Sequence, residues 1–529
     1  MRKYLNLTIQ YNVNVARKKR VNNPNLICFH VSMLEKDYTL YSLSRIEYKK
    51  QISLLREKLY NEQRQFRNKN ASPLLLIIGG FDGAGKHETA NTITNWMDPR
   101  GLSTYDFEEN NIAELERPEF WKYWQTLPAK GEIGIYLGAW YNRPLSDQAY
   151  RKVDPATYER YLSRIKSLEK QLTEDGALII KLWISISKSE QQNRLHILKK
   201  NPLTRWRVTE AEETQAQHYD QFKISSEKLL KKTNYSYAKW HVIEGDNARP
   251  RMIKAAQTLQ DLLHSHQHKN PLLKKKIISI ASQKNNSVYA TNMTLDLGKQ
   301  LGKNTYKNKL EKYRGRLHEL SIETIKKRIG VVLVFEGVDA AGKGGAIRRL
   351  LVALDAHRYR VIPIAKPTEE EKRYHYLWRF WQHVPTKGMI TIFDRSWYGR
   401  VLVERVEGFA TTEEWNRAYS EINDFEEQLI ENNTAVIKFW IQISKDEQLK
   451  RFRARQNTPH KEWKINEEDW RNREKWEQYE EAVEKMILQT STDIAPWTIV
   501  EGNDKRFARV KVIKTVCNQL EQTINRVTI

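Results

Sequence analysis

Two lysines that follow glycine-rich loops are the residues with the clearest chemical potential in this chain. Residues 80–86 read Gly-Phe-Asp-Gly-Ala-Gly-Lys, and residues 337–343 read Gly-Val-Asp-Ala-Ala-Gly-Lys. Each loop closely follows an apolar run, at 74–78 or at 331–335. In this Walker A pattern the glycines let backbone N–H groups close around phosphate oxygens, while the lysine adds a positive charge. The sequence therefore predicts a protein that handles phosphate groups.

The two loops belong to a repeat of domain size. Lys86 and Lys343 are 257 positions apart, and the same offset relates many residues downstream of the loops. The shared positions include Trp124 with Trp381, Trp140 with Trp397, Tyr141 with Tyr398, Arg143 with Arg400, Lys181 with Lys438, Trp183 with Trp440, Arg194 with Arg451 and Glu244 with Glu501. A repeat of this length fits two domains of one fold in a chain of 529 residues.

Composition divides the chain into four segments. Residues 1–43 lack clear periodicity and are predicted to form an N-terminal extension. Residues 269–298 mix lysines with Ser, Asn and Thr and are predicted to form a linker. The two repeats then occupy 44–268 and 299–529, and each begins with a charged helical pattern.

Apolar runs alternate with helical stretches within each repeat. In the second repeat the runs lie at 331–335, 360–365, 389–393, 435–443 and 497–500. Mostly apolar strands separated by helices are typical of a parallel sheet that is covered on both faces. We therefore predict the α/β class, with two tandem P-loop kinase-like α/β/α sandwich domains. The basic stretch from Lys445 to Arg455 and the Trp-rich segment 463–480 are predicted to form a helical lid.

The second repeat carries a more complete set of groups for phosphoryl transfer than the first. Its third apolar run ends in Asp394 and Arg395, where a Walker B carboxylate that holds magnesium normally lies. The first repeat has Leu137 and Gly138 at these positions, and leucine offers no oxygen to a hard cation. We therefore predict that the first repeat is a degenerate, inactive copy and that the second repeat is catalytic.

The residue after the second loop lysine bears on metal binding. An ordinary Walker A motif has Ser or Thr there, whose hydroxyl binds magnesium, whereas this chain has Gly344. Metal binding must then fall on carboxylates, with Asp394 as the first candidate and Asp339 as the second. This pattern argues against a standard ATPase or GTPase.

Together these motifs resemble the polyphosphate kinase 2 family. The resemblance lies in residues 337–345, 366–371, 377–381 and 394–400 and in Glu404-Arg405-Val406, and it extends over both repeats. The tandem arrangement resembles the two-domain subgroup of that family. Membership implies transfer of the terminal phosphoryl group of inorganic polyphosphate to a nucleotide with Mg²⁺, for which Mn²⁺ is an alternative. In this subgroup the usual acceptor is AMP, which becomes ADP.

The resemblance and the loop pattern together assign roles to the second repeat. Lys343 and the loop residues Gly337, Ala341, Gly342 and Gly344 are expected to hold phosphates, while Asp339 and Asp394 bind the metal. Arg395, Arg400, Arg451 and Arg455 are candidates to stabilise the transferring group, Lys366 to contact phosphate, and Glu404 to lie near metal and nucleotide. Arg400, Arg451 and Glu404 have counterparts in the first repeat, so structural ion pairs remain the alternative for them. The shared tryptophans are expected to pack in cores, and no histidine receives a catalytic role.

Charge and cysteine content narrow the class of protein further. Lysine and arginine total 89 against 65 acidic residues, and a net charge of +24 attracts polyanions. We expect inorganic polyphosphate and AMP or ADP as partners, with no membrane and no nucleic acid, while a homo-oligomer remains open. Cys28 and Cys517 are the only cysteines, which excludes a disulfide framework or a cysteine-rich zinc site. The absence of a signal-like segment and of an 18-residue apolar run leads us to expect a cytoplasmic enzyme.

Three alternative functions stay open on the sequence. The first is polyphosphate-dependent phosphorylation of ADP to ATP. The second is an ATP-dependent nucleoside monophosphate kinase, which shares the loop and the lid. The third is a basic nucleic-acid-binding protein that has kept a vestigial fold.

Overall fold

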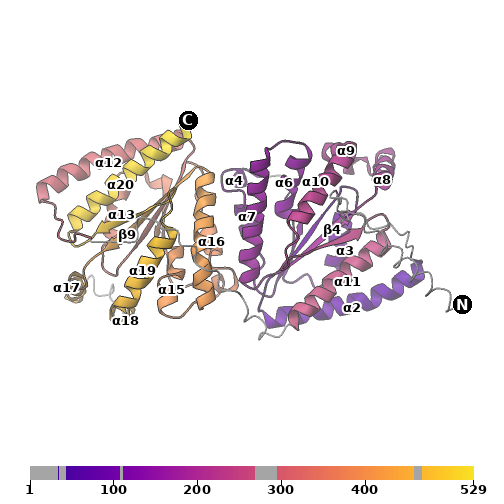
Figure 1. Cartoon of the computed structure of the whole chain (residues 1–529), viewed down its shortest axis with the longest axis horizontal. Helices are drawn as coiled ribbons and strands as arrows, with labels where there is room; N and C mark the ends of the chain where they lie inside the picture. Colours follow the sequence, from indigo (N-terminus) through magenta and orange to yellow (C-terminus); the bar gives the residue numbers. More distant parts are fainter. Residues whose placement is uncertain (1–33, 35–42, 108–110, 269–294, 458–466, 529) are drawn as a thin grey trace, which may run out of the picture. The chain divides into compact units, whose positions relative to one another are not determined.

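A computed structural model describes residue 34 and residues 43–107, 111–268, 295–457 and 467–528 (Figure 1). The predicted extension at 1–43 and the predicted linker at 269–298 lie almost entirely outside these residues, and so does 463–466 of the predicted lid. The rest of the chain forms two α/β repeats.

The first repeat is built on a five-stranded, all-parallel sheet. Its strands are β1 (Leu74–Gly80), β2 (Leu102–Asp106), β3 (Ile133–Leu137), β4 (Leu178–Ser185) and β5 (Trp240–Glu244) in the spatial order β2-β3-β1-β4-β5. All seven residues of β1 are buried, because this strand lies between two neighbours and is covered on both faces.

The second repeat has the same sheet. Its strands are β6 (Gly330–Gly337), β7 (Tyr359–Pro363), β8 (Ile390–Asp394), β9 (Thr434–Gln442) and β10 (Trp497–Glu501) in the order β10-β9-β6-β8-β7. All of its ladders are parallel. Each strand coincides with one of the five predicted apolar runs to within a few residues, and the predicted fold class is confirmed.

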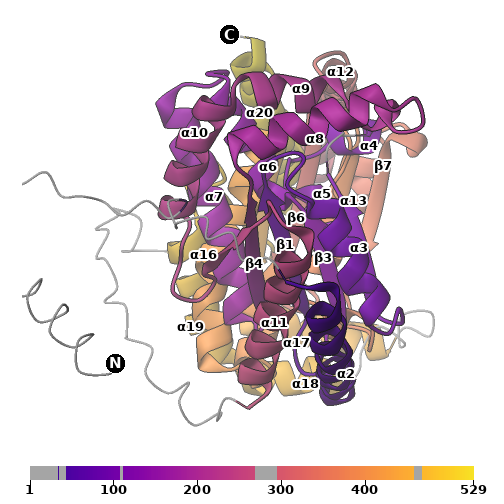
Figure 2. The ribbon, with the colours of Figure 1, turned by 90° about the vertical axis from the view of Figure 1, so that its right-hand side faces the viewer.

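Helices flank each sheet (Figures 1 and 2). In the first repeat they are α2 (Arg45–Lys69), α3 (Lys86–Trp96), α4 (Ile112–Leu115), α5 (Trp121–Gln125), α6 (Asn142–Ala149), α7 (Pro155–Glu174), α8 (Lys188–Lys200), α9 (Glu210–Gln217), α10 (Tyr219–Lys232) and α11 (Ala248–Gln267). In the second they are α12 (Lys303–Lys326), α13 (Lys343–Leu351), α14 (Trp378–Trp381), α15 (Val403–Val406), α16 (Thr412–Glu431), α17 (Lys445–Gln456), α18 (Glu467–Glu474), α19 (Trp476–Thr490) and α20 (Lys505–Thr528).

Two groups of helices sandwich the second sheet. Helix α20 packs on β9 and β10 and pairs with α12, whereas α16 packs on β9 and pairs with α19. Figure 1 shows these two pairs on opposite sides of β9. The apolar core on the α12 and α20 side includes Leu317, Leu333, Phe439 and Val512. These contacts make the three layers that the alternation of strands and helices predicts.

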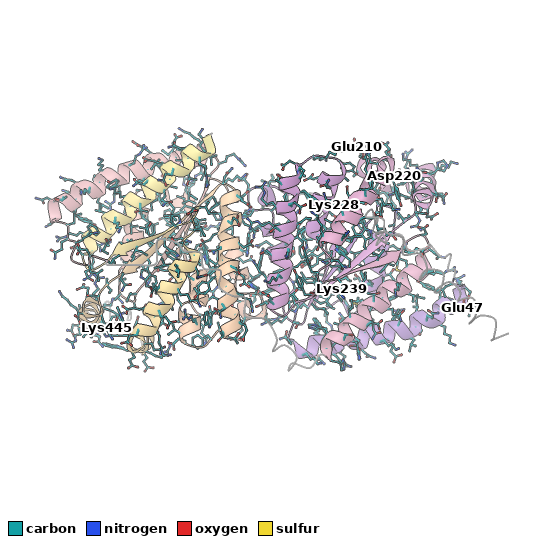
Figure 3. All side chains as sticks on the ribbon, viewed as in Figure 1. Glu47, Glu210, Asp220, Lys228, Lys239 and Lys445 are labelled. Carbon is teal, nitrogen blue, oxygen red and sulfur yellow. The ribbon has the colours of Figure 1, made fainter. Side chains whose placement is uncertain are left out.

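The described charged residues lie largely at the surface. Figure 3 labels several exposed examples, among them Glu210, Lys239 and Lys445. Within the described part of the chain, no helix combines the length and the hydropathy that a membrane span requires.

Paired side chains connect the two repeats. The equivalent residues Trp124 and Trp381 stack on each other, with ring centroids 5.6 Å apart and ring planes 13° from parallel. Arg164 of α7 forms an ion pair with Asp424 of α16. The backbone N–H of Lys130 donates to the carbonyl of Arg373 at 3.0 Å. The prediction that shared tryptophans pack in cores is therefore incomplete, because this pair is buried between the repeats.

A buried ion pair recurs at the same place in both repeats. Lys438 Nζ donates to Glu426 Oε2 at 2.7 Å, to the Tyr398 hydroxyl at 2.9 Å and to the Thr490 carbonyl at 2.8 Å. Trp397 Nε1 also donates to Glu426. Burial lowers the pKa of Lys438, which the charge of Glu426 opposes, and it raises the pKa of Tyr398 well above its usual value.

The first repeat reproduces this cluster. Lys181 Nζ donates to Glu169 Oε2 at 2.9 Å and to the hydroxyl of Tyr141 at 3.0 Å, and Trp140 Nε1 donates to Glu169. These contacts join the sheet to α7, just as the Lys438 cluster joins β9 to α16. The recurrence of these residues at an offset of 257 is therefore explained by structure rather than by catalysis.

We expect Glu426→Ala to lower the free energy of unfolding by roughly 3–5 kcal/mol, because Lys438 would stay buried without its counter-ion. Denaturant unfolding followed by tryptophan fluorescence measures this change. The double variant Glu426→Leu with Lys438→Met is the control and should be more stable than Glu426→Ala alone. Equal stability of Glu426→Ala and the unaltered protein would contradict this view of the cluster.

Candidate active site

The loop of the second repeat connects the end of β6 to the first turn of α13. Gly337 and Gly342 have φ values of 150° and 111°, which favour glycine. A Cβ atom at Gly337 would lie 2.4 Å from the carbonyl oxygen of Ile441, so no side chain fits there. The loop therefore brings backbone N–H groups to the positive end of a helix dipole, an arrangement that suits a phosphate.

The loop lysines of the two repeats have different partners. In the first repeat Lys86 Nζ forms an ion pair with Asp82 Oδ1 at 2.8 Å. In the second repeat Lys343 Nζ instead donates to the carbonyl of Gly337 at 2.7 Å. Because its partner is a neutral carbonyl, Lys343 has a positive charge that the loop aspartate of its own repeat, Asp339, does not neutralise.

The loop aspartate of the second repeat is held by other residues. Arg395 Nη2 donates to Asp339 Oδ1 at 3.2 Å, and Asn472 Nδ2 donates to Asp339 Oδ2 at 2.9 Å. The first repeat has Gly138 in place of Arg395 and Gln215 in place of Asn472. Gln215 Oε1 accepts a hydrogen bond from the backbone N–H of Asp82, and the carboxylate of Asp82 pairs with Lys86 instead. Two substitutions thus accompany the change of partner.

A further ion pair stands beside the first loop. Arg251 is buried and pairs with Glu88, which occupies the position of Gly345 in the second repeat. Arg251 also donates to the carbonyl of Ala84 at 3.0 Å, and a Cβ atom at Gly85 would lie 2.4 Å from its Cζ. The first turn of α3 therefore carries an ion-paired carboxylate where the second repeat has the bare backbone of a glycine.

All three guanidinium nitrogens of Arg451 donate hydrogen bonds within the protein. Its Nε donates to Glu447, and its two terminal nitrogens donate to the backbone carbonyls of Ala340, Ala341, Gly502 and Asn503. Arg194 makes the equivalent contacts in the first repeat. Arg451 thus ties the loop to the chain at the end of β10, which is the structural role that the sequence left open as the alternative to catalysis.

Arg400 and Glu404 form the structural pair that the sequence left as an alternative. Their side chains are 3.1 Å apart, and the guanidinium of Arg400 lies 4.5 Å from the ring centroid of Tyr376. Burial raises the pKa of Glu404, and the charge of Arg400 opposes this rise. Arg143 and Asp147 repeat the pair at 3.5 Å in the first repeat.

Three further candidates are Asp394, Lys366 and Arg455. Asp394 is partly buried at the end of β8, and no side chain of the described residues forms a hydrogen bond or ion pair with its carboxylate. Lys366 is exposed in the connection after β7, and Arg455 lies one turn beyond Arg451 on α17. Among the thirteen predicted site residues, the structure joins four pairs by direct contacts: Asp339 with Arg395, Arg400 with Glu404, Lys343 with Gly337, and Arg451 with Ala341.

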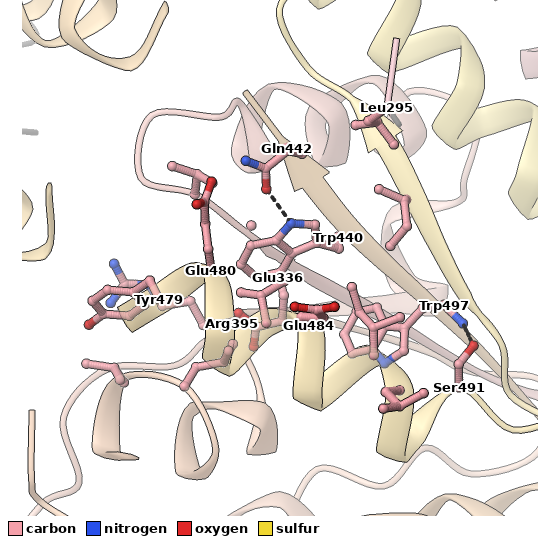
Figure 4. Close-up of a pocket in the computed structure, with 18 of the residues that line it drawn as sticks. Leu295, Glu336, Arg395, Trp440, Gln442, Tyr479, Glu480, Glu484, Ser491 and Trp497 are labelled. Atoms are coloured by element: carbon pink, nitrogen blue, oxygen red, sulfur yellow. Dashed lines mark hydrogen bonds between the residues drawn. The ribbon is translucent and has the colours of Figure 1, made fainter. Parts of the chain in front are cut away.

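A pocket of about 920 Å³ opens beside the loop (Figure 4). Gly337, Asp339 and Arg395 line it among the predicted site residues. The remainder of its wall includes the aromatic residues Trp440, Trp476, Tyr479 and Trp497 and the carboxylates Glu336, Glu480 and Glu484. Trp440 thus borders a cavity rather than only packing in a core. A pocket with aromatic walls that ends at a phosphate-binding loop has the character of a nucleotide site.

The first repeat fills the equivalent space with its own side chains. Phe81 stacks on Tyr219 with ring centroids 5.1 Å apart, and it packs edge-to-face with Phe222 and Trp183, whose ring centroids are 5.1 Å and 6.1 Å away. The residue that corresponds to Phe81 in the second repeat is Val338, which lines the pocket. The smaller side chain leaves the space between the loop and α19 open.

Three features of the site were missed from the sequence. The first is Asn472, which donates a hydrogen bond to Asp339, and the second is Val338, whose small side chain lines the pocket. The third is Glu336, which is buried and accepts a hydrogen bond from Ser396 Oγ at 2.8 Å. Burial raises the pKa of Glu336. The aligned repeats show valine at 338 where the first repeat has phenylalanine at 81. This difference is the one signal in the sequence that could have indicated a larger pocket in the second repeat.

The fold and the site define a class of protein. A parallel sheet whose central strand leads through a glycine-rich loop into a helix, with acidic and basic groups beside that loop, is the architecture of P-loop phosphotransferases. Within this class, the chain belongs to the polyphosphate kinase 2 family, which matches residues 42–271 and again residues 300–527.

Individual relatives are similar over most of the chain. The polyphosphate:AMP phosphotransferase of Pseudomonas aeruginosa is 42% identical over 492 residues, which cover 92% of this chain and 99% of that protein. The polyphosphate:AMP phosphotransferase of Acinetobacter johnsonii is 37% identical over 457 residues, which cover 85% and 92%. A crystal structure of a polyphosphate kinase 2 from Pseudomonas aeruginosa matches with a TM-score of 0.82 over 92% of this chain and 98% of that one, at 42% identity. The family predicted from the motifs is confirmed.

We expect Asn472→Ala to lower kcat for phosphoryl transfer by roughly tenfold to a hundredfold, since a hydrogen bond to a charged carboxylate is worth about 1.5–3 kcal/mol. Steady-state kinetics with polyphosphate and AMP measure the change. Gln215→Ala at the equivalent position of the first repeat is the matched control and should leave kcat unaltered. Equal losses in both variants would contradict the assignment of Asn472 to the site.

Proposed function

We propose that the second repeat transfers the terminal phosphoryl group of inorganic polyphosphate to AMP and so forms ADP. The names of the two-domain relatives support this substrate pair, and those relatives align with both repeats. The observation that carries the choice of repeat is the pairing of the loop lysines. Lys86 is paired with its loop aspartate, whereas Lys343 is not.

The reaction requires positioning and charge neutralisation more than acid–base chemistry. A phosphate oxygen of AMP is ionised at neutral pH, so it attacks the terminal phosphorus without a general base. A new P–O bond forms between this oxygen and the terminal phosphorus, while the bridging P–O bond to the next phosphate of the chain breaks. The shortened polyphosphate leaves as an anion. Lys343, the loop N–H groups and Arg395 offset the negative charge on the transferred group.

The donor set beside the loop fits a magnesium ion. Mg²⁺ takes one or two carboxylates and completes its shell with water and substrate phosphates. No group of three or more His, Cys, Asp or Glu side chains among the described residues forms a ready cage for a metal ion. Asp394 and Asp339 are the carboxylates that would hold Mg²⁺ or Mn²⁺, which when bound neutralises and orients phosphate oxygens. Gly344 has no hydroxyl to bind the ion, so metal binding depends on these two carboxylates.

The pocket between the loop and α19 provides a place for the acceptor nucleoside. Aromatic walls at Trp440 and Trp476 suit a purine base, and carboxylates at Glu480 and Glu484 can accept hydrogen bonds from ribose hydroxyls. Asp339 and Arg395 lie where the same pocket meets the loop. A nucleotide bound there would direct its phosphate toward the loop that holds polyphosphate.

Under this proposal, the first repeat is an inactive copy with a structural role. It lacks the carboxylate of Asp394, its loop lysine is neutralised by Asp82, and Phe81 fills the pocket. It nevertheless keeps the loop, the sheet and the buried ion pair, and it contacts the second repeat through Trp124 and Trp381.

We expect Lys343→Ala and Asp394→Asn each to reduce ADP formation from polyphosphate and AMP at least about a thousandfold, because each removes charge stabilisation from the transferred group. Chromatographic detection of ADP measures the loss. Lys86→Ala is the matched control in the first repeat and should retain most of the activity. Parallel assays with ATP as donor, or with ADP as acceptor, separate this function from its two nearest alternatives.

We also expect Val338→Phe to weaken AMP binding by roughly tenfold or more, since the aromatic ring would occupy the pocket as Phe81 does in the first repeat. Calorimetric titration of AMP into the full chain measures its affinity. Phe81→Val is the reciprocal control, which should leave AMP affinity unchanged even if it destabilises the first repeat. An unaltered affinity in folded Val338→Phe would place the acceptor elsewhere.

A further inference from the structure

The segment that enters the second repeat contributes to the wall of the pocket. Leu295 and Leu297 line the cavity with Trp440 and Trp497 (Figure 4). This segment, residues 295–299, is called the strap below. It precedes α12 and is far in sequence from β9, β10 and α19, which form the rest of the wall.

The strap has a defined local conformation. The N–H of Leu297 donates to the carbonyl of Leu295 at 2.9 Å, and the N–H of Gly298 donates to Asp296 Oδ1 at 3.0 Å. The N–H of Lys299 donates to the carbonyl of Asp296 at 3.3 Å. Asp296 is exposed while the two leucines are partly buried, so the turn directs its apolar side chains to the pocket.

An ion pair ties the strap to the end of β10. Lys299 Nζ lies 2.8 Å from Glu501 Oε1, and Lys511 Nζ lies 2.6 Å from Glu501 Oε2. Burial acts to raise the pKa of Glu501, but the hydrogen bonds from the two lysines outweigh it and lower the pKa. In the first repeat the equivalent Glu244 has a raised pKa through burial and the charge of Asp246. The doubly paired carboxylate is thus a feature of the repeat that has the open pocket.

The two leucine side chains of the strap offer the pocket apolar surface without hydrogen-bonding groups. Gln442, which also lines the pocket, accepts from Trp440 Nε1 at 2.7 Å and donates to the carbonyl of Ile443 at 3.0 Å. Its carbonyl oxygen and one of its two N–H groups are therefore engaged within the protein. A base that turns additional donors and acceptors toward the two leucines would bury those groups there without partners, which is unfavourable.

We propose that the strap is a specificity element of the acceptor site, in which Leu295 and Leu297 contact the nucleobase and favour adenine over guanine. This inference rests on the proposed function, because it takes the pocket to be the place of the acceptor nucleoside. Lys299 acts through the leucines: it positions the strap by its ion pair with Glu501. The connection between the repeats thereby takes part in substrate selection.

Kinetics of the full chain with AMP and with GMP test the strap. We expect Leu295→Ala with Leu297→Ala to raise KM for AMP and to lower the ratio of kcat/KM for AMP over GMP roughly tenfold, while KM for polyphosphate stays unchanged. Lys299→Ala should shift the ratio in the same direction, and Lys299→Arg should restore it. Gln300→Ala, an exposed neighbour outside the pocket wall, is the matched control and should change neither KM nor the ratio.

Two results would overturn the inference. One is an unchanged ratio in the folded double variant, and the other is an equal rise in KM for AMP and for polyphosphate, which would mean that the strap acts on the loop as a whole. Thermal melting shows whether each variant is folded, and Leu295→Val with Leu297→Val serves if the alanine pair does not fold. Failure of the unaltered protein to form ADP would instead count against the proposed function.

Discussion

The buried pair of Lys438 and Glu426 is the interaction on which the geometry of the second repeat depends. It joins β9 to α16 and, through Tyr398 and Trp397, holds the chain immediately after the end of β8. That strand end carries Asp394 and Arg395, so the ion pair fixes the backbone from which the candidate metal ligand and the partner of Asp339 project. A buried pair of charges is stable only when all of its hydrogen bonds are made, so the pair holds the end of β8 in one position.

The same pair persists in the first repeat, where Leu137 and Gly138 replace the candidate site residues Asp394 and Arg395. Lys181 and Glu169 hold Tyr141 and Trp140 in the same way, yet the strand before them ends in leucine and glycine. The requirements of the fold and those of the site are therefore separable. The fold needs the buried cluster, while the site needs a few exposed or partly exposed side chains around the loop, and the latter can change without loss of the sheet.

Much of the architecture was predictable because its signals are local and repeated. Glycine positions in tight turns and long apolar runs can each be recognised within a single segment. The alignment of the two repeats then shows which of these features both repeats share. Side-chain partnerships were less accessible. Arg451 and Arg400 are arginines beside a phosphate-binding loop, yet the structure engages Arg451 with backbone carbonyls and Arg400 with Glu404. A long side chain reaches partners that are distant in sequence, so its role is set by what folding brings near.

The sequence by itself determined the two parallel sheets, the two loops, the family and the inequality of the repeats, because periodicity and motif spacing encode each of these within short segments. Only the tertiary structure decided which loop lysine is paired, that Asn472 reaches Asp339, and that Val338 borders a pocket where Phe81 fills one. It also decided that Leu295 and Leu297 meet Trp440 and Trp497 across that pocket. These facts depend on distances between elements far apart in the chain, and such distances follow from packing rather than from local pattern.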